Sequence, residues 1–478
     1  MRTAKLLGST VLAVGALLMA PTAQSAAAGA SSRASSTALS NATNSTALPP
    51  VRIVTARSGI APGVLFANAT PAYGTSPAWT GGPMIYDNAG HVIYYLPSSK
   101  VHVTLPVTYK GAPALAYHLT TGFAGGWTQG HWVILNQSYK QVGTIGDNVD
   151  HHELLTVQNG QMAYVDSYRA VTYDLSKFGG QANATVVEAV IQEINLGTGK
   201  VVFEWHSLPH VPVTETNQSL KDNVVDYLHI NSIAVDTDGN LIVSGRHISA
   251  VLKINRKTGA VMWQLGGKQS TFAFTNGSGP SFQHDARIVG KNTYSVFDNG
   301  DSRSPQYSRA VIYKVDPVKR TASIVGDWRH SPDLFSQIEG DTRRLPNGDR
   351  LVGWATTGVT TEYSGHTVVF ESRIDGGTSY RTLRSAWKAT PASPPALTVH
   401  RNGTNVTADA TWNGATDVVG WELLGGPDAH HMRVLRTIPY TGFQMSQTMA
   451  VSGRDHVFSV RAVSQGSPAA QSSVAIVP

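Results

Sequence analysis

The chain of 478 residues contains no cysteine. This absence excludes disulfides, thiolate metal sites and cysteine nucleophiles, so the stability of the fold must come from core burial. Runs of lysine or arginine are also missing, because the basic residues are scattered and the formal net charge is only +6. The sequence therefore predicts neither a nucleic-acid partner nor attraction to a membrane surface.

Long apolar runs are lacking outside the N-terminus. There, Arg2 and Lys5 precede or border the apolar residues 6–20, and small residues that favour cleavage follow Pro21. This pattern predicts a signal peptide over residues 1–28, because the apolar stretch is too short to span a membrane. Since no cysteine is available for lipid attachment, we expect a secreted, extracellular protein without a membrane anchor.

Composition divides the rest of the chain into three parts. Residues 29–50 are rich in Ser, Thr, Ala and Asn, which predicts a disordered spacer. Residues 51–390 carry a repeated strand pattern, and a proline-rich break separates them from residues 391–478. The short alternating strands of this last part predict a small C-terminal β-sandwich of the fibronectin III or immunoglobulin type. No chemistry is assigned to it.

Two kinds of hairpin alternate within residues 51–390. The first kind begins at Val190, Ala250 and Ala310, about sixty residues apart. The second kind has Asp-Gly or Asn-Gly turns between alternating apolar runs, which favour β-hairpins. Helical periods are scarce. A four-stranded unit that repeats at this interval predicts an all-β chain with a β-propeller, and a set of unrelated sandwiches is the alternative.

Histidines recur at the start of the second kind of hairpin. His152, His229 and His284 begin three of these hairpins, and Arg246 lies at the far end of the hairpin that His229 begins. In a fourth hairpin, residues 339–341 replace the histidine. Equivalent strand starts of successive propeller blades meet at a central channel, so we expect these side chains to converge. One such histidine alone would be interpreted as a strand cap, but three with an arginine indicate a functional site.

The residue types in this cluster favour an anion over a metal ion. Three histidines could bind zinc or copper, but the guanidinium of Arg246 opposes a dication. Arginine instead presents a planar fork of donors to the oxygens of sulfate, phosphate or carboxylate. A neutral imidazole is also a competent nucleophile towards sulfur or phosphorus. We therefore expect no metal and no cofactor.

The ordered motifs HINS, SxRH and QHDA resemble the arylsulfotransferase family, and the similarity covers roughly residues 51–390. The resemblance implies a six-bladed propeller that moves a sulfuryl group from a phenolic sulfate ester to another phenol without a nucleotide donor. The partners would be a small aryl sulfate donor and a phenolic acceptor.

The same resemblance implies roles for the clustered residues. His284 matches the nucleophile, which would form a sulfohistidine intermediate, while His152, His229 and Arg246 match the residues that bind the sulfuryl group. Another histidine would exchange protons with the phenols. His151 is a rival for the role of His152 because the two are adjacent.

Three further points stay open in the sequence. His247 follows Arg246, so in a strand it would face away from the cluster and be structural. Residues 101–140 match the family pattern only loosely. A propeller that binds an anionic or glycan ligand without catalysis is the alternative function, and a metal or quinone oxidoreductase is a third.

Overall fold

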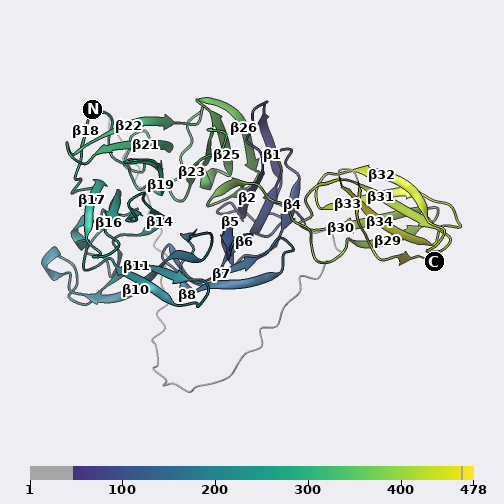
Figure 1. Cartoon of the computed structure of the whole chain (residues 1–478), viewed down its shortest axis with the longest axis horizontal. Coiled ribbons are helices and arrows are strands. Elements are labelled where there is room, and N and C mark those ends of the chain that lie inside the picture. The colour runs from purple at the N-terminus through teal and green to yellow at the C-terminus, as the bar shows by residue number, and fades with distance from the viewer. Residues whose placement is uncertain (1–46, 465–466, 478) are drawn as a thin grey trace, which may run out of the picture. The chain divides into compact units, whose positions relative to one another are not determined.

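The computed structural model describes residues 47–464 and 467–477. The predicted signal peptide, residues 1–28, lies outside this part, as do most residues of the predicted spacer, 29–50. Strands form nearly all of the regular structure, as predicted for an all-β chain (Figure 1). Within the described ranges the helical segments are three short 3-10 turns, namely η1 (Ser176–Phe178), η2 (Val213–Glu215) and η3 (Ala355–Thr357). No helix in these ranges is long and apolar enough to cross a membrane.

Six mainly antiparallel sheets are built from residues 51–385. The first contains β2 (Val64–Pro71), β3 (Gly82–Tyr86), β4 (Val92–Tyr95), β27 (Gly377–Thr378) and β28 (Thr382–Ser385). The second contains β5 (Val101–Tyr109), β6 (Ala112–Ala124), β7 (Trp127–Leu135) and β8 (Gln141–Val149). The third contains β9 (Leu154–Val157), β10 (Met162–Tyr173), β11 (Ala184–Asn195), β12 (Val201–His206) and β13 (Val224–Asp226).

The other three sheets follow in chain order. The fourth contains β14 (Ile230–Val235), β15 (Leu241–Gly245), β16 (Ala250–Ile254) and β17 (Val261–Gly266). The fifth contains β18 (Ala273–Phe274), β19 (His284–Gly290), β20 (Thr293–Asp298), β21 (Arg309–Asp316) and β22 (Thr321–Trp328). The sixth contains β23 (Asp341–Arg344), β24 (Arg350–Gly353), β25 (Val359–Ser364), β26 (Thr367–Ile374) and β1 (Val51–Ala56).

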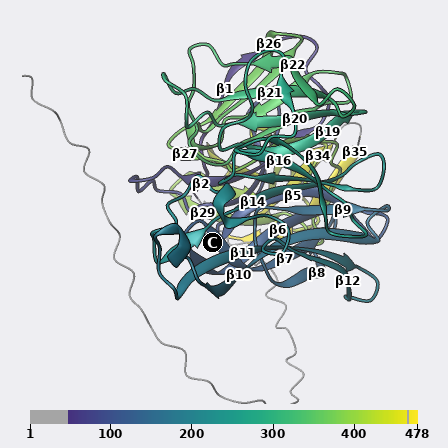
Figure 2. The ribbon, with the colours of Figure 1, turned by 90° about the vertical axis from the view of Figure 1, so that its left-hand side faces the viewer.

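The predicted hairpins are neighbouring strands of these sheets, which confirms the repeat found in the sequence. The first kind corresponds to β11–β12, β16–β17 and β21–β22. The second kind corresponds to β9–β10, β14–β15, β19–β20 and β23–β24. Figure 2 shows β10 and β11 of the third sheet running alongside each other. In the third, fourth and fifth sheets, one hairpin of each kind is therefore paired with the other.

Strands from the two ends of residues 51–385 complete the sixth and first sheets. The N-terminal strand β1 pairs with β26, and Val51 lies opposite Ile374. The late strands β27 and β28 pair with β2, and Ser385 lies opposite Val64. Segments far apart in the sequence are thus tied together by backbone hydrogen bonds.

The hydrophobic core is divided among consecutive sheets. Five buried clusters each join one sheet to the next, and a sixth joins the sixth sheet back to the first. In this last cluster, Leu65 and Met84 pack with Phe370. Strands β15 and β16 are buried at every position. Continuous apolar runs such as these are expected where both faces of a sheet are covered.

Two further sheets are built from residues 396–476. One contains β29 (Ala396–Asn402), β30 (Asn405–Thr411) and β33 (Gln444–Ala450). The other contains β31 (Val418–Gly426), β32 (Arg433–Pro439), β34 (Val457–Ser464), β35 (Ser467–Gln471) and β36 (Ala475–Ile476). Ala410 of the first sheet packs with Trp421 and Val460 of the second, so the two sheets share a core.

Candidate functional site

Two histidine–aspartate pairs lie side by side just before β9 and β14. The ring centroids of His152 and His229 are 4.8 Å apart. His152 donates its Nδ1–H to the buried Asp150, and His229 donates its Nδ1–H to Asp226 at 2.5 Å. These bonds fix Nδ1 as a donor nitrogen in each ring. Among the described residues, neither Nε2 has a hydrogen-bond partner.

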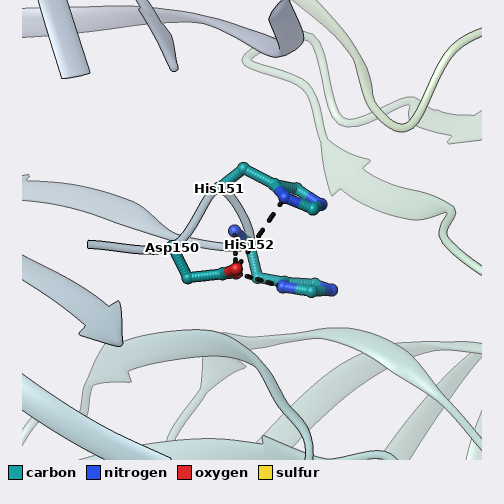
Figure 3. Close-up of side chains that lie close together, drawn as sticks. All are labelled: Asp150, His151 and His152. Atoms are coloured by element: carbon teal, nitrogen blue, oxygen red, sulfur yellow. Dashed lines mark hydrogen bonds and ion pairs between the residues drawn. The ribbon is translucent and has the colours of Figure 1, made fainter. Parts of the chain in front are cut away.

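The adjacent residues His151 and His152 make different contacts in the structure. Figure 3 shows both rings pointing in the same direction beside the Asp150 carboxylate, and they stack with centroids 4.3 Å apart. Their other contacts differ. The His152 ring lies against that of His229, whereas the centroid of the His151 ring lies 5.8 Å from that of His102. Of the two adjacent histidines, it is therefore His152 that the fold brings to His229.

Arg246 lies beside His229 because β14 and β15 form a tight hairpin. The Arg246 N–H donates to the His229 carbonyl oxygen at 3.0 Å. The guanidinium is largely buried and donates to His247 Nε2 at 2.8 Å and to the Gln337 carbonyl at 3.2 Å. The carboxylate of Asp301 is 3.7 Å away, and in the described part of the chain Nε has no partner. A buried cation with unused donors favours an anionic ligand.

The expectation that His247 faces away from the cluster is wrong. β15 ends at Gly245 and residues 246–249 form a turn, so strand alternation no longer applies. The His247 ring lies 4.6 Å from that of His229, and its Nδ1 donates to the Asp226 carbonyl. Burial lowers the pKa of His247 to about 3, so the ring is neutral and accepts the hydrogen bond from Arg246.

His284 is the first residue of β19, and both of its ring nitrogens are engaged. Nδ1 donates to Asn299 Oδ1 at 2.8 Å, and Asn299 is oriented by donating to the carbonyls of Ser336 and Glu339. Nε2 accepts from the Glu339 N–H at 3.1 Å, so Nε2 carries the lone pair. Burial, together with the charge of Arg246, holds the pKa of His284 well below its usual range. The ring is thus neutral, which is the nucleophilic form.

A tyrosine that the sequence analysis left without a role lies among these imidazoles. The centroid of the Tyr380 ring is 5.7 Å from that of His151, 5.6 Å from that of His152 and 6.1 Å from that of His284. Its hydroxyl is buried and has no hydrogen-bond partner among the residues that the structure describes. Tyr380 lies between β27 and β28, whose return to β2 is a long-range pairing that no local pattern reveals.

The motif residues interlock the strands that carry the histidines. Gln283 Nε2 donates to the Ala250 carbonyl at 2.9 Å, and Asn231 Nδ2 donates to the Gln283 carbonyl at 2.8 Å. Ser232 Oγ accepts from the Ala286 N–H at 2.8 Å. The motifs HINS and QHDA therefore fix the fourth and fifth sheets against each other, and with them His229 and His284.

A buried ionic network adjoins the same strands. Glu153, next to His152, accepts from Arg287 at 2.5 Å and from Arg381 at 3.3 Å. Asp285, next to His284, accepts from Arg287 at 2.9 Å. Arg381 also donates to the Asn231 carbonyl at 2.8 Å. The residues that follow two of the clustered histidines are thus held by shared arginines.

Two groups in the site bring donors close enough for a metal ion: Asp150 with His151 and His152, and Asp226 with His229 and His247. Their chemistry fits an anion better. Nδ1 of His152, His229 and His247 already donates to oxygen, and Arg246 donates to His247. The guanidinium of Arg246 lies 2.8 Å from His247 Nε2, so its charge would repel a dication bound by the second group.

An open cavity of about 380 Å³ is lined in part by His102 and by residues of the first two sheets and the segments that join their strands. Trp79, Pro77 and Ser98 contribute to its lining, as does His102, whose ring lies 5.8 Å from His151. No Asp, Glu, Lys or Arg belongs to this lining, within the residues that the structure describes. The cavity thus suits an uncharged molecule with an aromatic ring.

The chain belongs to the arylsulfotransferase (ASST) family, whose model matches residues 106–374, more than half of the chain. It is similar to the arylsulfate sulfotransferase AssT of Escherichia coli O6:H1, with 32% identity over 155 residues. That match covers 24% of this chain and 25% of the relative, so the alignment spans about a quarter of the relative's length.

Solved structures show weaker likenesses. A Bacteroides caccae protein of unknown function is 13% identical, with a TM-score of 0.42, and the match covers 67% of this chain and 98% of that one. Hydrazine synthase of Kuenenia stuttgartiensis is 12% identical, with a TM-score of 0.31, and the match covers 66% of this chain and 95% of that one. Both TM-scores lie below 0.5, so neither likeness defines the architecture further.

Proposed function

We propose that the protein transfers a sulfuryl group from a phenolic sulfate ester to a phenol, without a nucleotide donor. The observation that carries this proposal is the neutral His284 ring, with its lone pair on Nε2, in the same cluster as the buried and incompletely paired guanidinium of Arg246. Such a pair combines a nucleophile with a donor for the oxygens on which charge is held. Membership of the arylsulfotransferase family supports it.

In the proposed first step, Nε2 of His284 attacks sulfur and the bond from sulfur to the phenolic oxygen breaks. A sulfohistidine forms, and the Glu339 N–H, which contacts Nε2 at 3.1 Å, turns to a sulfuryl oxygen. Arg246 supplies further donors. His152 and His229, whose Nδ1–H groups are held by the carboxylates of Asp150 and Asp226, would contact the transferred group from the same cluster.

In the second step, the acceptor phenol attacks the sulfohistidine and releases Nε2, which gives ping-pong kinetics. The experiment that tests the function is release of 4-nitrophenol from 4-nitrophenyl sulfate, with and without added phenol. Stimulation by phenol, with formation of phenyl sulfate, is expected.

We further propose the architecture that the sheets and shared clusters support. Residues 51–390 would form a six-bladed β-propeller, because six sheets share clusters in cyclic order. Residues 391–478 would form a β-sandwich of the fibronectin III or immunoglobulin type, since two sheets enclose one core. Secretion after removal of residues 1–28 belongs to the same proposal and rests on sequence.

Replacement of Arg246 tests the anion site. Arg246→Lys keeps a charge but loses the planar fork of donors. We expect kcat/KM for 4-nitrophenyl sulfate with phenol to fall on the order of 10²- to 10³-fold, the cost of losing one preorganised donor. The matched control is Arg436→Lys, at an exposed position on β32, which should retain wild-type kinetics. Equal kinetics in the two variants would remove Arg246 from the site.

Replacement of Asn299 tests the tautomer of His284. In Asn299→Ala the acceptor for Nδ1–H is lost, so the lone pair is no longer directed to Nε2. We expect kcat/KM to fall by roughly 10²-fold or more, as in other sites that depend on an oriented imidazole. Steady-state kinetics check this, and unchanged KM for the acceptor would place the loss in the chemical step. Wild-type rates would contradict the assigned tautomer.

The alternative function is binding of an anionic ligand without turnover, and the buried Arg246 is compatible with it. Calorimetric titration with 4-nitrophenyl sulfate separates the two possibilities. Saturable binding by a folded protein that releases no 4-nitrophenol, with any of several phenols present, would favour the binding function.

A further inference from the structure

Glu339 is the first of the three residues, 339–341, that replace the histidine in the fourth hairpin. Its backbone is held against the nucleophile candidate at two points. The Glu339 N–H donates to His284 Nε2 at 3.1 Å, and its carbonyl accepts from Asn299 at 2.9 Å. Glu339 also adopts a left-handed conformation with a φ of 64°, which turns the chain just before Gly340 and β23. The side chain therefore starts from a position next to Nε2.

The carboxyl of Glu339 belongs to a partly buried residue. Its pKa is raised to about 7, and the cause is loss of solvation on burial. Within the described residues, it has no hydrogen-bond or ion-pair partner. A carboxyl with a pKa near neutrality can give and take a proton at working pH.

The charged and titratable groups around Glu339 come from several elements. They are His284 on β19, which accepts from the Glu339 N–H, and Tyr380 before β28, whose pKa the charge of Glu339 raises. Arg246 reaches this segment through the Gln337 carbonyl, two residues from Glu339. The carboxyl of Asp301, 3.7 Å from the Arg246 guanidinium, also has its pKa raised by burial, to about 6.

We propose that Glu339 is the general acid and base of the sulfuryl transfer, a step that rests on the proposed function. As the bond from sulfur to the donor oxygen breaks, its electron pair goes to that oxygen, which takes the Glu339 proton. The bond from Nε2 to sulfur forms at the same time. In the second step the acceptor oxygen attacks sulfur, its proton passes to the Glu339 carboxylate, and the electron pair of the broken nitrogen–sulfur bond returns to Nε2.

The histidines are less suited to this role than the sequence suggested. In His152 the ring proton is on Nδ1 and is directed to the Asp150 carboxylate, so Nε2 of the neutral ring has no proton to give. Burial lowers the pKa of His152, which keeps the ring neutral. His284 uses Nε2 for the bond to sulfur. The residue that contacts Nε2 through its backbone N–H and also carries a group able to exchange a proton is therefore Glu339.

The test compares two donors in Glu339→Gln, which keeps the shape and the backbone N–H. 4-Nitrophenolate leaves without protonation, whereas phenolate from phenyl sulfate needs an acid. In single-turnover experiments we expect the variant to retain the 4-nitrophenyl sulfate rate within about 10-fold and to lose about 10³-fold or more with phenyl sulfate. Equal losses with both donors would overturn the proposal.

The pH dependence gives a second measurement that needs no variant. The wild-type rate of phenol release from phenyl sulfate should fall as the pH rises through about 7, because the acid form of Glu339 is lost. The rate with 4-nitrophenyl sulfate should lack this limb. If both donors share one pH profile, Glu339 is not the acid. This comparison decides the question even if the Glu339→Gln variant fails to fold.

Two control variants assign the effect. Glu204→Gln, at a partly exposed carboxylate on β12, should match wild type with both donors. Asp301→Asn should change the single-turnover rates with both sulfate donors alike, because Asp301 acts through Arg246. A loss of rate with phenyl sulfate alone in that variant would assign the acid and base role to Asp301 and overturn the proposal. A folded wild-type protein that releases neither phenol would instead overturn the proposed function, and this role with it.

Discussion

His284→Ala should abolish sulfuryl transfer. We expect phenol-dependent release of 4-nitrophenol to fall by about 10⁴-fold or more, as when a covalent nucleophile is removed from an acyl-transfer site. The physical reason is that Arg246 and the other imidazoles can bind a sulfate ester but cannot form the intermediate. His284 is 2% exposed, and its neighbours Asn299 and Glu339 hold one orientation of the ring, so no other nitrogen replaces it.

The measurement has two parts. Steady-state release of 4-nitrophenol gives the rate, and mass spectrometry of protein quenched at alkaline pH detects a sulfuryl adduct on the peptide that contains His284. The control is His400→Ala, an exposed histidine on β29, which should be as active as wild type and form the adduct. Retained turnover in His284→Ala, or an adduct on another residue, would contradict the assignment. Equal release with and without phenol would indicate hydrolysis.

Arg381→Met should strongly destabilise the part of the chain that carries the site. Arg381 is 2% exposed and donates to Glu153 and to the Asn231 carbonyl, with Asp285 at 3.8 Å. Removing the guanidinium leaves two buried carboxylates with less compensating charge. We expect the free energy of unfolding to fall by about 3–5 kcal/mol, the usual cost of breaking a buried ion pair from one side.

Urea denaturation followed by circular dichroism measures this effect. The control is Arg52→Met, since Arg52 pairs with Asp375 at the surface and exposed ion pairs contribute little. A double variant with Glu153→Gln should recover part of the loss, because it removes the carboxylate that Arg381 compensates. Equal denaturation midpoints for Arg381→Met and Arg52→Met would show that the buried network does not stabilise the fold.

Much of the fold could be predicted because its signals are local. Asp-Gly and Asn-Gly turns between alternating apolar runs specify hairpins, and β14–β15 and β19–β20 form where the sequence predicts them. The pairing of β1 with β26, and of β27 and β28 with β2, could not be predicted. These contacts join distant segments, and short strands carry too little information to name their partners.

The residues of the candidate site could likewise be predicted only in part. His152, His229 and His284 could be singled out by sequence because they recur at equivalent places in repeated hairpins, and Arg246 because it ends the hairpin that His229 begins. His247 was misassigned because strand alternation stops at Gly245, where the chain turns. Tyr380 carried no signal at all, since its place among the imidazoles depends on the return of β27 and β28 to the first sheet.

The sequence by itself thus determined the all-β class, the repeated hairpins, the family resemblance and four clustered residues, because periodicity and motif spacing are properties of the chain. Only the tertiary structure decided which nitrogen of His284 carries the lone pair, which of His151 and His152 meets His229, and where Glu339 lies. These are decided by hydrogen bonds and burial among residues from different sheets. The protonation and orientation of a side chain depend on the residues packed around it, and the order of residues along the chain does not reveal which these are.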